Sequence, residues 1–257
     1  YDLITGISGI NLSHASFFLK KPSIMFDDDP QDYTTFQLYR NFTDKIILPK
    51  YTTVEGNEIK KYNGFKELAH LHPNYFKPNE NILKKYSLRP DKYVFFREQA
   101  PISIVYRHSY VGELYNYAKF LKTQGYKIIL SLENKSNANI YEKIGQVLKE
   151  PVDEFHSLIY YAAFTVSTGD SLARESALLG TPSIYTGKRD MPVNSELVNR
   201  GFLFKADNSF EIIQSIKKII TKDYKKALRK KVYRCIDEEW DDTTSFIVNQ
   251  IKEMLPR

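Results

Sequence analysis

The chain has one cysteine, Cys235, and one tryptophan among its 257 residues. A single cysteine excludes an internal disulfide and a zinc site built from several thiolates, and it favours a reducing compartment, so a cytoplasmic location is expected. No run of about 18 apolar residues is present, which argues against a membrane-spanning helix. The mixture of apolar, aromatic and charged residues is typical of a globular protein with a sizeable core.

The formal net charge is +6, and much of the excess lies in one basic segment, residues 217–234. Lysines and arginines interleave there with apolar residues at helical spacing, which predicts an amphipathic helix. One interpretation is a solvated helix face, and the other is peripheral contact with an acidic partner or with an anionic membrane at its cytoplasmic face. No recognition motif for nucleic acid accompanies the charge, so nucleic acid is not an expected partner.

Strand-like and helix-like segments alternate from the start of the chain, which favours an α/β fold. Strands are expected at 1–6, 23–26 and 45–48, with helices near 13–19 and 33–42 between them. A doubly wound half usually has two or three strands more than this. We therefore expect a substantial N-terminal piece to be absent, and the first sheet to expose an apolar edge.

A second alternation follows a proline-rich polar stretch that is typical of a linker. It begins with a strand at 93–96 and a helix over 111–121. The later elements are expected to be a strand at 127–130, a helix near 140–148 and helices near 210–220 and 244–255. The predicted domains are a partial N-terminal Rossmann-like lobe over 1–72, a linker over 73–92, a C-terminal Rossmann-like lobe over 93–240 and a terminal helix over 241–257.

The segment 164–185 contains a strand, a glycine turn, a short helix and a second strand within about twenty residues. Gly169 permits a tight turn, and Asp170 or Ser171 can cap the helix. Such a corner directs helical N–H groups toward the carboxyl edge of a parallel sheet, where anions bind. Glu175, one turn further along, can accept hydrogen bonds from a ribose diol. The corner therefore suggests a nucleotide site, and a tightly packed strand-helix connection is the alternative.

Several blocks of the chain resemble those of the DUF354 family, whose relatives are the GT-B glycosyltransferases and the UDP-N-acetylglucosamine 2-epimerases. The blocks are PSIMFDDD (22–29), TDKIILPK (43–50), YNGFKELAHLHP (62–73), VFFRE (94–98), SLE (131–133), FHSLIYYA (155–162) and TGDSLARESALLGTPSIY (168–185). The resemblance implies a GT-B-like α/β fold with two Rossmann-type lobes, each with a parallel sheet. The N-terminal lobe would be incomplete in this chain.

The resemblance also implies a donor site. In it, Glu175 would hold the ribose and Arg97 would face the diphosphate from across a cleft, although an ion pair with Glu98 or Glu133 is the alternative for Arg97. The turn that would receive the diphosphate comprises Thr168, Gly169, Asp170 and Ser171. No cofactor and no metal ligand set is predicted.

Asp27 falls where the related epimerases have one of their catalytic acids, and it could instead deprotonate an acceptor hydroxyl. The acids at 27–29 have two further interpretations, a divalent-cation site and an N-capping loop. Phe95 stands where the epimerases have a histidine, and Asn41 where they have a glutamate, so epimerase chemistry is poorly supported.

The predicted function is that of a GT-B-like glycosyltransferase that passes a sugar from a UDP-sugar to an unidentified acceptor, in the synthesis of a cell-surface polysaccharide or glycolipid. The alternatives are a non-catalytic protein that binds nucleotide sugars and a UDP-sugar 2-epimerase-like isomerase.

Overall fold

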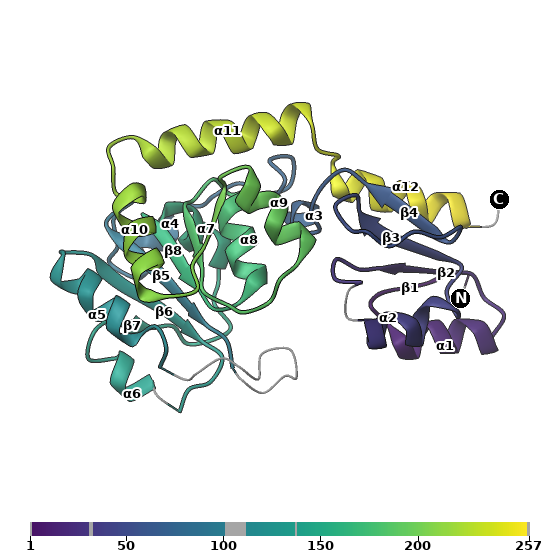
Figure 1. Cartoon of the computed structure of the whole chain (residues 1–257), viewed down its shortest axis with the longest axis horizontal. Helices are drawn as coiled ribbons and strands as arrows, with labels where there is room; N and C mark the ends of the chain where they lie inside the picture. The colour runs from purple at the N-terminus through teal and green to yellow at the C-terminus, as the bar shows by residue number, and fades with distance from the viewer. Residues whose placement is uncertain (1, 31–32, 101–111, 137, 256–257) are drawn as a thin grey trace. The chain divides into compact units, whose positions relative to one another are not determined.

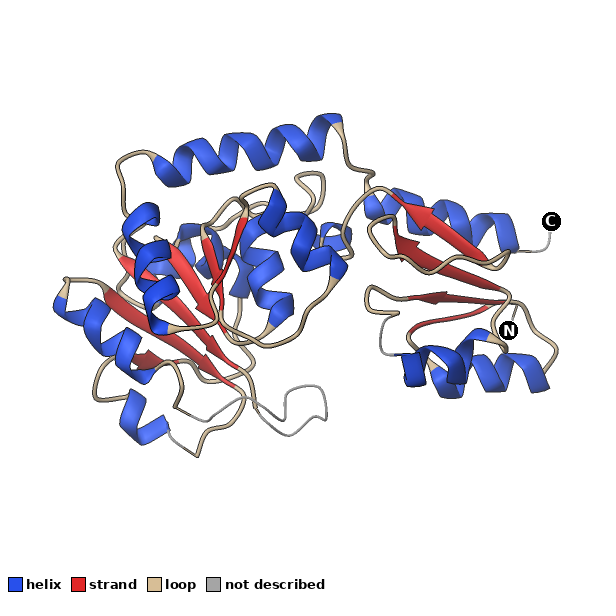
Figure 2. Ribbon diagram, viewed as in Figure 1, coloured by secondary structure: helices blue, strands red, loops and turns tan. Residues whose placement is uncertain are grey.

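The computed structural model describes residues 2–30, 33–100, 112–136 and 138–255. It is an α/β fold with two parallel sheets, each in its own compact unit (Figures 1 and 2). Tyr1 and Val111, which were included in predicted elements, lie outside the described residues. No described helix is both long enough and apolar enough to cross a bilayer.

Unit 1 comprises Tyr1–His72, Met191–Glu196 and Cys235–Arg257. Its strands are neighbours in chain order, and every neighbouring pair is parallel. They are β1 (Ile4–Ile7), β2 (Ser23–Phe26), β3 (Lys45–Pro49) and β4 (Ile59–Tyr62), accompanied by α1 (Ile10–Phe18), α2 (Tyr33–Arg40), α3 (Leu68–Leu71) and α12 (Thr243–Met254).

Both faces of this sheet are covered, because successive strand residues point to opposite sides. Met25 and Ile46 pack on one face with Phe36 of α2, whereas Ile24 and Ile47 pack on the other face with residues of α12. Figure 2 shows α1 and α2 on one side of the sheet and α12 on the other. Within the described residues β1 is an edge strand. Ile7 at its end is 72% exposed, whereas Ile4 of the same strand packs against the core.

Unit 2 comprises Pro73–Asp190 and Leu197–Arg234. Its sheet runs β10-β9-β8-β5-β6-β7, with every pair parallel. The strands are β5 (Tyr93–Glu98), β6 (Lys127–Leu132), β7 (Gln146–Val147), β8 (Phe164–Ser167), β9 (Ser183–Tyr185) and β10 (Leu203–Lys205). The helices are α4 (Asn81–Lys85), α5 (Tyr115–Thr123), α6 (Ala138–Tyr141), α7 (Phe155–Tyr161), α8 (Asp170–Leu178), α10 (Ser209–Ile219) and the greater part of α11 (Tyr224–Glu238), whereas α9 (Pro192–Asn199) is divided between the units.

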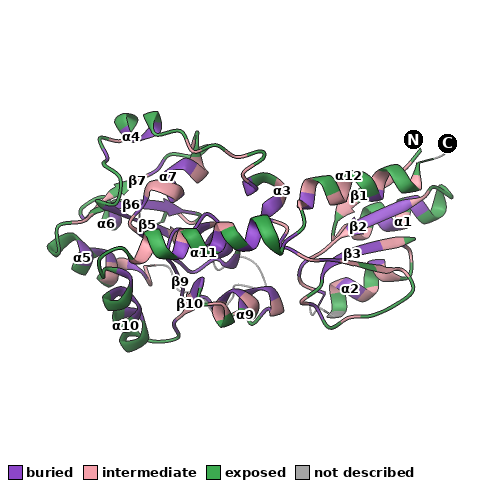
Figure 3. Ribbon diagram, turned by 90° about the horizontal axis from the view of Figure 1, so that it is seen from above, coloured by how far each residue is buried: buried purple, intermediate pink, exposed green. Residues whose placement is uncertain are grey.

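The central strands of unit 2 are buried along nearly their whole length (Figure 3). Phe95, Phe96 and Val166 are each 0% exposed. A strand covered by helices on both faces reads as a continuous apolar run rather than as an alternating one, which is why β5 and β8 were recognised in the sequence. The segment 73–92, predicted as a linker, carries α4, and its Ile82 and Leu83 are buried.

Three further features differ from the sequence-based predictions. The helix expected near 140–148 is the short helix α6 followed by the edge strand β7. Strands β4 and β10 were not predicted, because each is short and carries lysine. The basic segment 217–234 is divided between α10 and α11, and Asp223, directly before α11, has φ +64°, a left-handed conformation outside the helical range.

Helix α11 is anchored to unit 2 by a lysine that lies largely out of solvent. The Lys225 ammonium donates to Asp91 Oδ1 at 2.5 Å and to the Ala162 carbonyl at 2.6 Å. Burial, together with the nearby charge of Arg229, lowers the pKa of Lys225 to about 8, although Asp91 opposes this shift. Because the unfolded chain holds the lysine proton up to about pH 10.4, the charged lysine costs folding free energy at neutral pH.

This cost predicts a pH-dependent stability. Below pH 8 both the folded and the unfolded state carry the Lys225 proton, and the cost to folding is present in full. Between about pH 8 and 10.4 the unfolded state binds more protons than the folded state. In this range the unfolding free energy should therefore rise by up to about 1.4 kcal/mol per pH unit because of Lys225. Lys225→Met should lack this rise in urea unfolding, whereas Lys226→Met at the exposed neighbouring position should retain it. Equal pH slopes for wild type and Lys225→Met would contradict the assignment.

Candidate functional site

The order of strands in unit 2 creates a switch point between β5 and β8. From β5 the chain proceeds to β6 and β7 on one side, and from β8 it proceeds to β9 and β10 on the other. In open α/β sheets, ligands bind at such a point, outside the carboxyl ends of the strands. Arg97 lies near the end of β5, and Thr168 and Gly169 directly follow β8.

A cavity of about 630 Å³ opens at this sheet edge. Arg97, Ser171 and Glu175, three of the residues predicted for the donor site, line it together. Its other lining residues are Gln99, Glu133, Glu150, Pro151, Val152, Phe155 and Leu172. Its volume lies within the range of small-molecule sites.

The turn that enters α8 is held by its own side chains. The Ser167 hydroxyl accepts from Gly169 N at 3.0 Å and donates to Gly169 O at 2.7 Å, and the Thr168 hydroxyl accepts from Gln99 N at 2.7 Å. A Cβ on Gly169 would meet the Gln99 side-chain oxygen, which lies at the end of a flexible side chain. Thr168 and Gly169 are buried and do not line the cavity. They shape the turn instead.

Asp170, the first residue of α8, is also buried and holds two arginines. Its Oδ2 lies 2.6 Å from Arg189 Nη1 and 3.6 Å from Arg174 Nη1, and Arg174 is only 1% exposed. Asp170 Oδ1 accepts from Ser171 N at 3.0 Å. Since the Asp170 carboxylate is already engaged in this way, its observed contacts are structural. The residue that it brings to the helix end is Arg189.

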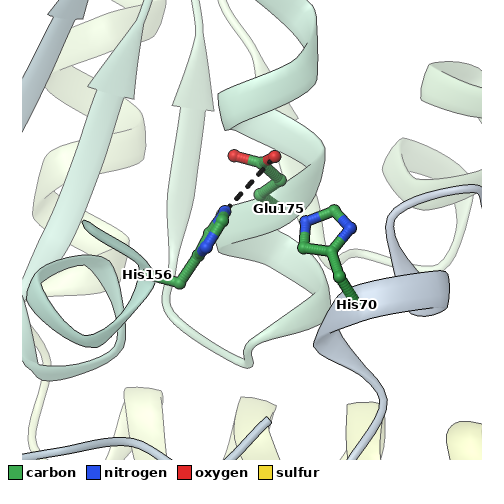
Figure 4. A group of neighbouring side chains, drawn as sticks. All are labelled: His70, His156 and Glu175. Atoms are coloured by element: carbon green, nitrogen blue, oxygen red, sulfur yellow. Dashed lines mark ion pairs between the residues drawn. The ribbon is translucent and has the colours of Figure 1, made fainter. Parts of the chain in front are cut away.

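Glu175 lies one helical turn beyond Ser171 and faces the cavity. One of its carboxylate oxygens lies 3.4 Å from His156 Nε2, as Figure 4 shows. The His156 ring in turn packs edge-on against Phe76 and Phe155. Because the Glu175 side chain is only 18% exposed, it lies at the wall of the cavity with its direction set by α8 and His156. A hydroxyl-bearing ligand would meet an oriented acceptor there.

Arg97 is bound on both sides by carboxylates. Its guanidinium donates to Glu133 Oε1 at 2.6 Å and to Glu150 Oε1 at 2.9 Å, and also to the Ser131 hydroxyl at 2.5 Å. The expected pairing with Glu133 is therefore present, and Glu150 is an additional partner that the sequence did not indicate. Glu98, the other expected partner, is buried and accepts from Gly112 N at 2.8 Å.

The lining charges of the cavity set a condition on any anionic ligand. Among the described lining residues Arg97 is basic, whereas Glu133, Glu150 and Glu175 are acidic. A diphosphate would have to replace Glu133 or Glu150 as the acceptor of some of the Arg97 hydrogen bonds. A planar guanidinium with five N–H donors permits this exchange. The N–H groups and positive dipole end of α8 would add to the attraction.

Asp27, the predicted catalytic residue, belongs to unit 1, where it follows β2. Its Oδ1 accepts from Asp29 N at 2.9 Å and its Oδ2 accepts from the Tyr39 hydroxyl at 2.5 Å. Burial raises the pKa of Tyr39, and the Asp27 charge raises it further. Tyr39 therefore remains a proton donor and fixes the direction of the Asp27 carboxylate.

Sequence reasoning did not identify Gln99, Glu150, Arg189 or Tyr39. Gln99 and Arg189 each closely follow a strand of the sheet, so their positions at strand ends were a usable signal. Glu150 and Tyr39 had no such signal, because their roles depend on contacts between segments distant in the chain.

A two-lobed α/β architecture of this kind is shared with solved GT-B glycosyltransferases and with UDP-GlcNAc 2-epimerases. The Methanocaldococcus jannaschii UDP-GlcNAc 2-epimerase, solved with UDP-GlcNAc and UDP, is 15% identical with a TM-score of 0.68, over 98% of this chain and 76% of that one. The Neisseria meningitidis UDP-GlcNAc 2-epimerase bound to UDP-GlcNAc is 13% identical with a TM-score of 0.66, over 98% and 76%. The spinosyn rhamnosyltransferase is 11% identical with a TM-score of 0.63, over 98% and 73%.

The chain belongs to the DUF354 family, a family of proteins of unknown function, which matches residues 4–256. An uncharacterized protein of Methanocaldococcus jannaschii is 24% identical over 221 residues, which are 80% of this chain. The aligned part spans 64% of the length of that relative. The predicted family is thereby confirmed, as is the predicted α/β fold with two parallel sheets.

The buried pair of Asp170 and Arg174 predicts a large effect on stability. Asp170→Asn removes the negative charge that faces a buried guanidinium, and the unfolding free energy should fall by about 3 kcal/mol. Asp207→Asn is the matched control, because Asp207 is 55% exposed and lies 3.9 Å from Lys188; it should change stability by less than about 0.5 kcal/mol. Urea unfolding measures both variants, and a similar small loss in the two would show that the Asp170 charge is not needed.

Proposed function

We propose that this chain is a GT-B-like glycosyltransferase that uses a UDP-activated sugar. The observation that carries the proposal is the cavity at the switch point of unit 2. It is lined by Ser171 in the first turn of α8, by the Glu175 carboxylate and by Arg97. The fold that it shares with solved structures holding UDP or UDP-GlcNAc supports the nucleotide. The proposed acceptor is a precursor of a cell-surface polysaccharide or glycolipid.

In the proposed complex the ribose hydroxyls donate to Glu175, and the diphosphate occupies the start of α8. Glu175 is suited to this role because a carboxylate accepts bonds and donates none, and a vicinal diol offers two donors. His156 beside it keeps the carboxylate directed toward the cavity. Ser171 is exposed at the helix start and offers a hydroxyl, and Arg189 adds positive charge at the same helix end.

Chemistry in the proposed reaction depends on stabilising the leaving group. The bond between the anomeric carbon and the diphosphate oxygen breaks, its electron pair goes to the UDP diphosphate, and the acceptor oxygen forms the new bond to that carbon. Arg97 and the helical N–H groups stabilise the charge that develops on UDP. Asp27 is the group that takes the proton of the acceptor hydroxyl, and Tyr39 positions it.

A 2-epimerase is the second candidate, because several of the similar structures are UDP-GlcNAc 2-epimerases. The side chains argue against this activity. Phe95 is 0% exposed and packs against Phe155, and Asn41 is a neutral amide, so neither can transfer a proton. A non-catalytic protein that binds nucleotide sugars is the remaining alternative.

Binding of UDP should depend on Glu175. Glu175→Ala should weaken UDP binding by about 1 to 3 kcal/mol, because the ribose hydroxyls lose their acceptor on binding. Glu175→Gln keeps one acceptor oxygen and should lose less, and Glu142→Ala, at an exposed position outside the cavity, should bind as wild type does. Isothermal calorimetry gives the affinities. Unchanged affinity of Glu175→Ala for UDP would contradict the assignment of the ribose site.

The reaction products distinguish the three candidate functions. A glycosyltransferase should release free UDP from a UDP-sugar faster when membrane or glycan acceptors are added, and Asp27→Asn should slow this release by about two orders of magnitude or more. We expect no N-acetylmannosamine from UDP-N-acetylglucosamine by NMR. Robust epimerisation would overturn the transferase proposal, and UDP binding with no release under any condition would favour the non-catalytic alternative.

A further inference from the structure

Unit 1 contains a second, smaller cavity at the carboxyl edge of its own sheet. Its volume is about 170 Å³. Ile7, Phe26 and Tyr62 line it from the last residues of β1, β2 and β4, whereas α3 adds Ala69 and α12 adds Ile247. A cavity of about 150 Å³ with aliphatic and aromatic walls is large enough to bind benzene. This cavity therefore suits a group of phenyl size.

Most of the polar groups at its wall are already engaged. Asp28 is 6% exposed, and its Oδ1 lies 2.9 Å from Lys66 Nζ, so the two charges compensate each other. The Thr243 hydroxyl donates to the Phe65 carbonyl at 3.1 Å. Asp27 is the remaining charge at this wall.

The Asp27 carboxylate is held in place and retains acceptor capacity. Each of its oxygens receives one hydrogen bond, from Asp29 N and from the Tyr39 hydroxyl, and a carboxylate oxygen can accept two. A neutral hydroxyl at this position would gain a charge-assisted hydrogen bond. A phosphate or carboxylate would instead meet the like charge of Asp27, because the nearby Lys66 ammonium is already paired with Asp28.

We propose that this cavity is a binding site for an uncharged apolar alcohol, with the apolar group among Ile7, Phe26 and Ile247 and the hydroxyl on Asp27. The inference rests on the proposed function, since the alcohol would be the part of the acceptor that carries the reacting hydroxyl. Of the two proposed acceptor types it favours the glycolipid precursor: the hydroxyl is carried by an apolar body of phenyl or short branched alkyl size, and no phosphate lies next to it.

The direct test is NMR on protein with ¹³C-labelled isoleucine methyl groups, titrated with benzyl alcohol. The methyl signals of Ile7, Ile47 and Ile247 should shift with one saturable millimolar constant. Those of Ile128 and Ile144, which lie in unit 2, should not. No shift of the three unit 1 signals, or equal shifts throughout the chain, would overturn the proposal.

Two variants make the test specific. Ala69→Leu fills the cavity and should weaken binding of benzyl alcohol at least about tenfold, because the larger side chain occupies the ligand volume. Ala227→Leu, at an exposed position of α11, is the matched control and should bind benzyl alcohol as wild type does. Asp27→Asn removes the charge without changing the volume, and it keeps the proposal testable if Ala69→Leu does not fold. Wild type should reject benzoate, whereas Asp27→Asn should bind benzoate and benzyl alcohol with similar affinity. Equal binding of benzoate and benzyl alcohol by wild type would overturn the role of Asp27.

Failure of this inference can be distinguished from failure of the proposed function. UDP calorimetry reports on unit 2, and the methyl signals of Ile7, Ile47 and Ile247 report on unit 1. If UDP binds but benzyl alcohol does not, the alcohol site is wrong and the transferase proposal stands. If benzyl alcohol binds but UDP does not, an apolar site exists, and its interpretation as an acceptor site is overturned.

Discussion

The burial of Arg174 is the constraint on which the candidate site depends. A guanidinium that is 1% exposed must face a negative charge, and Asp170 provides one from the first residue of α8. The same carboxylate holds Arg189 from the loop after β9. The Asp170–Arg174 pair lies within α8, whereas Arg189 fixes the loop after β9 against the start of α8 and so helps to set the direction of this helix. Ser171 and Glu175 face the cavity because α8 has this direction.

The charged residues of the cavity favour an exchange of hydrogen-bond partners at Arg97 rather than permanent binding of an anion. Arg97 divides its donors between Glu133 and Glu150, so the guanidinium is positioned and its charge is compensated while no ligand is bound. An incoming diphosphate would compete with these acids for the same donors. Such a site would bind a nucleotide through several moderate contacts, with the ribose contact at Glu175 setting the position and Arg97 responding to the phosphate charge.

Much of the fold could be predicted from the sequence, because buried parallel strands are continuous apolar runs and the amphipathic helices have a clear period. The edge strands β4, β7 and β10 could not, since each is short and β4 and β10 carry lysine. At the site, Ser171 and Glu175 followed from the glycine turn and the helical spacing. Asp170 was predicted to face a ligand, but its carboxylate pairs with two arginines, and Arg189, Glu150 and Tyr39 depend on tertiary contacts that no local pattern encodes.

The central claim is that the cavity at the switch point of unit 2 holds UDP through Glu175. A crystal structure of this chain with UDP tests it most directly. The account predicts both ribose hydroxyls within hydrogen-bonding distance of the Glu175 carboxylate, with the diphosphate at the start of α8 near Ser171 and in contact with Arg97. UDP bound elsewhere, or bound in this cavity with Glu175 making no contact to the ribose, would contradict the account.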